Sequence, residues 1–167
     1  TLRFHTIFQE HQVDTDENDT CAILDDTAFQ KSGVRIEAVS KVFGHVTHSF
    51  IYGIKCLTLA LSDEKAAIPI DFSLHREKGK NKNSGLTLKQ RKEQFKEKRN
   101  IKNPDYARKV ECNESKLEMA KRMLRHSVKH GINSKYVLAD SWFTCESYIH
   151  TVRELCGGAI HYIGLAR

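Results

Sequence analysis

Apolar and polar positions alternate along this chain in a pattern that predicts a mixed α/β fold. Five apolar runs have the length of strands, at residues 21–24, 50–61, 66–74, 136–139 and 159–166. The second and third runs are joined by the polar turn at residues 62–65, which predicts a β-hairpin. Within this hairpin, Gly53 and Pro69 indicate an edge strand or a bulge.

Two helices are predicted in the C-terminal half, where apolar residues recur at helical spacing. Asn113 is expected to cap the first helix and Gly131 to end it, while Gly157 ends the second. The first helix is the crossover that lets the strand at 136–139 lie parallel to the strand at 21–24. The apolar faces comprise Leu117, Ala120, Leu124 and Val128 in the first helix, and Cys145, Tyr148, Ile149, Val152 and Cys156 in the second.

Acidic residues follow two of the predicted strands. Asp25 and Asp26 come after the run at 21–24, and Asp140 comes after the run at 136–139. Neighbouring strands lie about 4.8 Å apart, so Asp25 and Asp140 are expected to share a divalent cation. Asp26 is the weaker ligand, because successive side chains point to opposite faces of a strand. Taken singly, Asp25 and Asp26 also fit an Asx turn, and Asp140 fits a helix N-cap.

The most basic part of the chain runs from residue 76 to residue 102, and its residues 86–99 have helical composition with few apolar anchors. Two interpretations are open for it: a solvated, weakly packed insertion, or a surface that follows DNA phosphates. Lys31 and Arg35 likewise either meet an anionic substrate or neutralise the nearby acids as surface pairs. The candidate DNA-binding residues are Lys31, Arg35, Arg76, Lys78, Lys89, Arg91, Lys92 and Lys96.

Composition narrows the function classes only slightly. The 167 residues suit one domain, and 27 Lys plus Arg against 21 Asp plus Glu give a net charge of +6. A positive surface favours nucleic acid or another polyanion, but charge alone does not decide the partner. The five cysteines form no C-x-x-C pair, which argues against zinc and a disulfide framework and favours reduced thiols. No run approaches the roughly 18 apolar residues of a membrane span, so we expect a cytoplasmic protein.

The order of these elements and motifs resembles the ribonuclease H-like fold and, more closely, the bacterial insertion-sequence DDE transposases. The residues Leu24-Asp25-Asp26-Thr27 resemble the first-acid motif of that family, in which a strand is followed by Asp, any residue and Thr. Residues 136–143 resemble the second-acid motif, an apolar strand followed by Asp, a small residue and an aromatic residue. Residues 68–78 are also similar to one branch of the family. The resemblance covers roughly residues 21 to 166.

This resemblance implies a DNA transposase in which Asp25 and Asp140 are catalytic, metal-binding acids. Such enzymes hydrolyse phosphodiester bonds and transfer strands with two Mg²⁺ or Mn²⁺ ions. The implied partner is double-stranded DNA, both transposon ends and target, bound by a homodimer in a bacterial cell. The expected organisation is a lead-in at residues 1–20 and a partial ribonuclease H-like catalytic domain at 21–167, with a basic insertion at 76–112.

The third acid of this family is a glutamate on a helix beyond the last strand. The chain ends at Arg167, before such a helix begins, and Glu146 and Glu154 lie too early to match it. The resemblance therefore predicts a fragment of a longer protein that is inactive by itself. One alternative is a non-catalytic DNA-binding remnant of a transposase. Another is a different nuclease on the same fold, such as a resolvase or ribonuclease H, although neither requires the basic insertion or the Asp-Asp-Thr motif.

Overall fold

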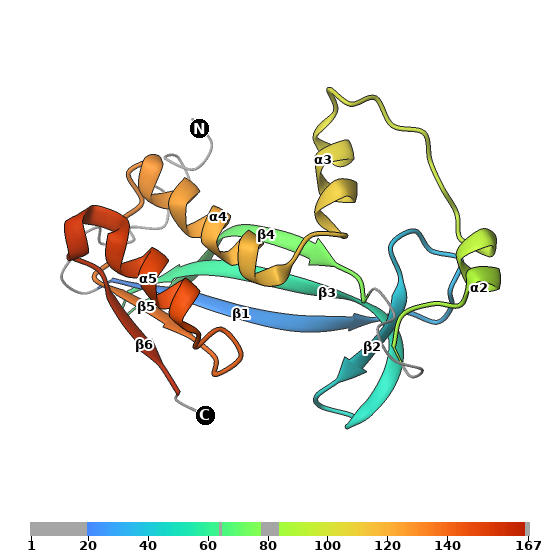
Figure 1. The fold of residues 1–167 in the computed structure, drawn as a ribbon, viewed down its shortest axis with the longest axis horizontal. Coiled ribbons are helices and arrows are strands. Elements are labelled where there is room, and N and C mark those ends of the chain that lie inside the picture. The colour runs from blue at the N-terminus through green and yellow to red at the C-terminus, as the bar shows by residue number, and fades with distance from the viewer. Residues whose placement is uncertain (1–19, 64, 78–83, 166–167) are drawn as a thin grey trace. The chain divides into compact units, whose positions relative to one another are not determined.

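The computed structural model describes residues 20–63, 65–77 and 84–165 (Figure 1). Lys78 and nearly all of the expected lead-in lie outside these residues. The chain forms two compact units. The first unit comprises the described residues up to Asp25, those within Thr58–Phe72 and those from Leu117 onward. The second unit comprises Asp26–Leu57 and the described part of Ser73–Lys116.

Six strands form a mixed sheet. In chain order they are β1 (Cys21–Gln30), β2 (Ser40–Gly44), β3 (Ser49–Ser62), β4 (Ala67–His75), β5 (Tyr136–Ala139) and β6 (His161–Gly164). The strand order is β2-β3-β1-β5-β6, and β4 pairs with β3 as the predicted hairpin. β2 and β3 are antiparallel, whereas β5 is parallel to both β1 and β6. This combination of strands with helices confirms the expected ribonuclease H-like α/β fold.

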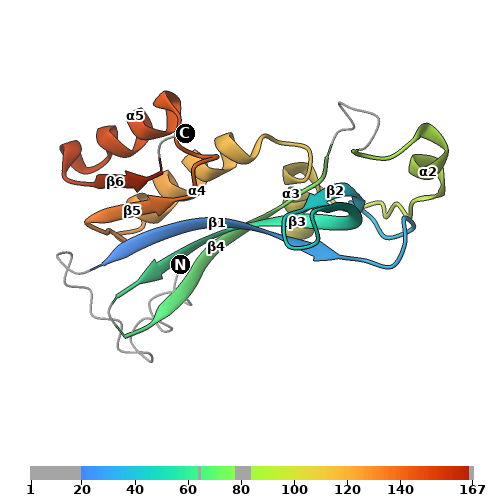
Figure 2. The same ribbon diagram turned by 90° about the horizontal axis from the view of Figure 1, so that it is seen from below.

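In the first unit, helices α4 (Lys116–Lys129) and α5 (Glu146–Glu154) lie on one face of β1, β5 and β6 (Figures 1 and 2). The register of β1 and β5 pairs Ala22 with Val137 and Leu24 with Ala139, and all four side chains are buried. The apolar helix residues that complete this core are Met119, Ala120, Met123 and Leu124 of α4 and Tyr148 and Val152 of α5. The core confirms the predicted crossover by α4.

β1 is longer than the sequence predicted. It continues beyond the predicted run at residues 21–24, through both acids, to Gln30. Strand β3 is 14 residues long and offers backbone partners in this region: the N–H of Lys31 donates to the carbonyl of Tyr52 at 2.8 Å. Backbone pairing with a long neighbour keeps β1 extended where its own side chains are polar. The short strand β2 was also not predicted.

The basic segment contains less helix than its composition predicted. Only α2 (Leu88–Glu93) is helical within residues 86–99. The chain turns away after it because the buried side chain of Gln94 donates to the carbonyl groups of Ile36 and Val39, at 2.9 and 2.7 Å. A further helix, α3 (Pro104–Glu111), was not predicted; its proline occupies the first turn, where a missing N–H costs nothing.

Two sequence predictions about the ends of α4 and α5 were wrong. Asn113 does not cap α4, because the helix begins at Lys116 and Asn113 Oδ1 accepts a hydrogen bond from Arg76 Nε at 2.7 Å. After α5 the chain enters a 3₁₀ turn, η1 (Leu155–Gly158), so Cys156 does not share the helix face with the other apolar residues. Gly131 follows α4 with a φ of 76°, as predicted. No helix within the described ranges has the length and hydrophobicity needed to cross a membrane.

Gly53 in β3 provides a test of this packing. A Cβ atom at Gly53 would lie 2.6 Å from the carbonyl oxygen of Phe29, a backbone atom of β1. We expect Gly53→Ala to lower the free energy of unfolding by about 1–3 kcal/mol, because the two strands would have to separate. Urea denaturation measures this, with Gly33→Ala as the control, since nothing lies within 4 Å of that position. Equal losses in both variants would contradict the close approach.

Candidate active site

Asp25 and Asp140 lie at the same end of two neighbouring strands in the first unit. The parallel register of β1 and β5 ends with the pair Leu24 and Ala139, and the two aspartates are the next residues. Both aspartates are exposed, whereas Leu24 and Ala139 are buried. Alternation along β1 puts the Asp25 side chain on the opposite face from the buried Leu24, and Asp140 begins the turn that follows β5. Because neighbouring strands are about 4.8 Å apart, the two aspartates are candidates for one shared site.

A turn after β5 holds Asp140 in place. Its Oδ1 atom accepts a hydrogen bond from the N–H of Trp142, and its carbonyl oxygen accepts one from the N–H of Phe143 at 3.0 Å. Helix α5 begins only at Glu146, with Cys145 at the cap position, so Asp140 is not the helix N-cap that one interpretation of the sequence suggested. Two carboxylate oxygens offer about four acceptor sites, so a single backbone bond leaves Asp140 able to bind a cation.

Thr144 and Tyr162 lie beside this turn. The Oγ1 atom of Thr144 is 2.9 Å from the hydroxyl of Tyr162 and donates to the carbonyl of Asp140 at 3.4 Å. Burial raises the pKa of Tyr162, and the charge of Asp140 adds a smaller contribution in the same direction. Tyr162 therefore keeps its proton near neutral pH, so it is a hydrogen-bond donor and not a base.

The carboxylate oxygens of Asp25 and Asp140 suit a hard divalent cation. Mg²⁺ and Mn²⁺ prefer carboxylate oxygens and are commonly held by one or two carboxylates, with water and phosphate oxygens as further ligands. Asp25 and Asp140 match that pattern. Within the ranges that the structure describes, no group of three or more His, Cys, Asp or Glu residues is placed to hold a metal ion. Among the described residues, Asp25 and Asp140 are therefore the candidate ligands for such an ion.

Asp26 is anchored in the second unit by two lysines. Its Oδ2 atom accepts a hydrogen bond from Lys116 Nζ at 2.7 Å and lies 3.8 Å from Lys55 Nζ. The side chains of Asp26 and Lys55 are 11% exposed and that of Lys116 is 14% exposed. A shielded carboxylate that two ammonium groups already neutralise is a poor ligand for a further cation. Of the two adjacent acids, Asp25 is therefore the candidate metal ligand.

His75 lies in the second unit, and its contacts identify it as a structural residue. It is buried, and burial lowers its pKa below the usual range for histidine. The neutral ring is satisfied at both nitrogens: Nδ1–H donates to the carbonyl of Glu114 at 3.3 Å, and the Ser73 hydroxyl donates to Nε2 at 2.7 Å. His75 is therefore already engaged and is not a candidate base.

The predicted DNA-binding residues in the described ranges are all at least partly exposed. Arg76 and Arg91, which are far apart in the sequence, line the same depression of about 240 Å³ in the second unit. Arg76 Nε donates to Asn113 at 2.7 Å and Arg91 Nε to the carbonyl of Leu86 at 3.1 Å, so both guanidinium groups are oriented. Oriented guanidinium groups suit a phosphate, although Glu77 also lines this depression and weakens its positive potential.

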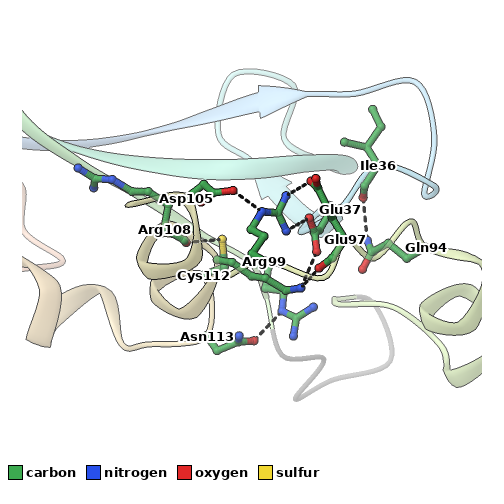
Figure 3. Close-up of polar contacts among 11 residues, drawn as sticks. Ile36, Glu37, Gln94, Glu97, Arg99, Asp105, Arg108, Cys112 and Asn113 are labelled. Atoms are coloured by element: carbon green, nitrogen blue, oxygen red, sulfur yellow. Dashed lines mark hydrogen bonds and ion pairs between the residues drawn. The ribbon is translucent and has the colours of Figure 1, made fainter. Parts of the chain in front are cut away.

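Arg99 belongs to the same basic segment but is partly shielded and forms an ion network with neighbouring side chains (Figure 3). Its guanidinium lies 2.5 Å from Glu37, 3.2 Å from Glu97 and 3.0 Å from Asp105, and Lys109 lies 3.0 Å from Glu37. Burial alone would raise the pKa of Glu37, but hydrogen bonds from Lys109 and Arg99 lower it overall. This network ties the segment to α3, so the interpretation as a weakly packed insertion does not hold here.

Lys55 and Lys116 were missed as site residues by the sequence analysis. Lys55 interrupts the apolar run at residues 50–61, and a lone charge in a buried strand signals a partner. Lys116 has no such signal, because its partner is distant in the sequence. These two lysines form the ion pairs of Asp26 within the described residues, whereas Lys31 and Arg35 are exposed.

Comparison with known proteins yields one match. The sequence model of a family described as DDE superfamily endonuclease matches residues 5–163, which include both Asp25 and Asp140. Separate comparisons with curated proteins and with solved structures find no match.

The two adjacent acids of β1 are expected to respond differently to the same substitution. Asp26→Asn should lower the free energy of unfolding by about 2–3 kcal/mol, because it breaks the 2.7 Å ion pair with Lys116 and the contact with Lys55, which keeps its 3.9 Å contact with Glu77. Asp25→Asn, at an exposed position, should change it by no more than about 0.5 kcal/mol. Chemical denaturation in metal-free buffer measures both, and a larger decrease for Asp25→Asn would overturn the assignment.

Proposed function

The chain belongs to the DDE superfamily of endonucleases, a family of nucleases and transposases that act on DNA, and from this premise we propose that it is a DNA transposase. In this proposal it hydrolyses phosphodiester bonds at transposon ends and transfers the freed strand to a target. A homodimer on DNA is part of the proposal, since two transposon ends have to be held together.

The observation that supports this proposal is the shared position of Asp25 and Asp140. Both follow the last paired residues of adjacent parallel strands, both are exposed, and Asp26 is held elsewhere by its lysines. Asp25 and Asp140 would hold Mg²⁺ or Mn²⁺, and the bound metal would supply Lewis-acid stabilisation of the charge on the phosphate. Further carboxylate ligands would come from outside the described residues.

The remaining residues have supporting roles in this proposal. The turn after β5 orients Asp140 through the N–H of Trp142. Lys89, Lys92 and Lys96 are exposed on the basic segment and would bind the DNA backbone, together with the oriented Arg76 and Arg91. Lys31, Arg35 and Lys78 belong to the same proposed surface.

A second candidate is a DNA-binding remnant without catalysis. The described residues hold no three-membered acid cluster, which favours this candidate as long as no further acid joins Asp25 and Asp140. It retains the basic surface and DNA binding but predicts no strand cleavage. Nicking of supercoiled plasmid in Mn²⁺ distinguishes the two: nicking that Asp25→Asn and Asp140→Asn both abolish supports the transposase, and DNA binding without nicking supports the remnant.

Metal binding is the direct test of the site. Titration calorimetry with Mn²⁺ and Mg²⁺ should show binding that Asp25→Asn and Asp140→Asn each weaken by at least about tenfold, since each removes a ligand. Glu146→Gln and Glu154→Gln are matched controls, because both are exposed acids of the first unit and should bind as wild type does. Equal weakening by the controls would mean that only general negative charge attracts the ion.

DNA binding tests the basic surface. Replacing Lys89, Lys92 and Lys96 by Ala should weaken binding to duplex DNA and reduce the slope of log affinity against log salt by about one for each phosphate that the variant no longer neutralises. The control replaces three exposed cations elsewhere, Lys65, Lys129 and Arg153. Fluorescence anisotropy at several salt concentrations measures both sets. Identical salt slopes for the two triple variants would remove the basic segment from the DNA-binding surface.

A further inference from the structure

The segment that joins α2 to α3, residues 94–103, is held firmly at its start. Its first residue, Gln94, is 6% exposed. Its side chain donates to two carbonyl groups of the loop between β1 and β2, at 2.9 Å to Ile36 and 2.7 Å to Val39. The next residue, Phe95, donates its N–H to the carbonyl of Arg35 at 2.7 Å. The backbone that carries the Phe95 side chain is therefore fixed by its own hydrogen bond and by that of its neighbour.

The same segment, here called the connecting segment, is also anchored further along (Figure 3). Lys109 Nζ donates to the carbonyl of Glu97 at 2.9 Å, and Arg99 is enclosed by its carboxylate network. A turn closes its far end, where the N–H of Asn103 donates to the carbonyl of Asn100 at 2.9 Å. Anchors at both ends and in the middle give this irregular stretch a defined shape.

The anchored backbone displays apolar side chains to solvent. Phe95 is 62% exposed, Ile101 is 71% exposed and Leu88, at the start of α2, is 76% exposed. The same stretch of sequence carries the exposed lysines Lys89, Lys92, Lys96, Lys98 and Lys102, which outnumber its exposed acids, Glu93 and Glu97. Keeping a phenyl ring in water forgoes the stabilisation that its burial would bring. A ring held in this way is a candidate recognition element.

The surrounding charge selects the partner. Lysine is depleted in the cores of protein–protein interfaces, so an exposed aromatic residue on a lysine-rich segment fits a protein partner poorly. Nucleic acid fits both features, because lysines bind phosphates and aromatic rings stack on bases. A ring can stack on the face of a base only where that face is not covered by the next base pair. The chemistry therefore favours an unpaired base beside a bound backbone.

We infer that Phe95 stacks on an unpaired base of DNA, at a strand end or an opened base pair, while the lysines of the connecting segment and α2 hold the adjacent phosphates. This inference rests on the proposed function, because it takes DNA as the substrate. It adds a base-contacting residue in the second unit, distinct from the two carboxylates of the first unit.

The test compares two labelled DNAs with the full chain: a blunt duplex and the same duplex with a short unpaired 3′ extension. Phe95→Ala should bind the extended DNA about tenfold more weakly and keep its affinity for the blunt duplex, since stacking serves only the unpaired base. Phe95→Trp should retain or improve binding to the extended DNA. Ile101→Ala, a similarly exposed position on the same segment, should change neither affinity.

A base analogue gives an independent readout. With 2-aminopurine as the first unpaired base, binding should change its emission in wild type and in Phe95→Trp but not in Phe95→Ala. The inference is overturned if Phe95→Ala binds the extended DNA as wild type does, or if its affinity falls equally for both DNAs. In either case wild type still binds the blunt duplex, and the proposed function stands. If wild type binds neither DNA, both the stacking inference and the proposed function are overturned.

Discussion

The parallel pairing of β1 with β5 is the constraint on which the candidate site depends. Residues 21 and 136 are far apart in the chain, and α4 provides the crossover that brings the two strands side by side in register. Because the register pairs Leu24 with Ala139, the next residue on each strand is an aspartate at the same level. The apolar core beneath them stabilises the register, since a slip of one residue would bury the acids.

β1 carries two neighbouring acids with opposite environments. Alternation along an extended chain separates their side chains, so Asp25 faces solvent and Asp26 faces a shielded pair of lysines. This division explains how an acidic pair can be accommodated on one strand. Asp25 is exposed and is the candidate ligand, whereas Asp26 is neutralised within the fold, where its removal would break the ion pairs with Lys55 and Lys116.

The basic segment likewise divides its residues between structure and surface. Gln94 and Arg99 turn inward and bind carbonyl groups and carboxylates, whereas Lys92, Lys96 and Phe95 are exposed. Net charge counts Arg99, Lys92 and Lys96 alike, but only the outward lysines can attract a polyanion. The inward residues give the outward ones fixed positions, which is the arrangement expected of a recognition surface.

The sequence by itself determined the fold class, the β3–β4 hairpin, α4, α5 and the pairing of Asp25 with Asp140 as candidates, because these follow from local periodicity and from short motifs at strand ends. The length of β1, the strand β2 and the helix α3 were decided only by tertiary structure, since their backbone groups find partners far along the chain. The same holds for charge. No local pattern states that Asp26 meets Lys55 and Lys116 or that Arg99 meets Glu37, because an ion pair depends on distances that only the folded chain sets.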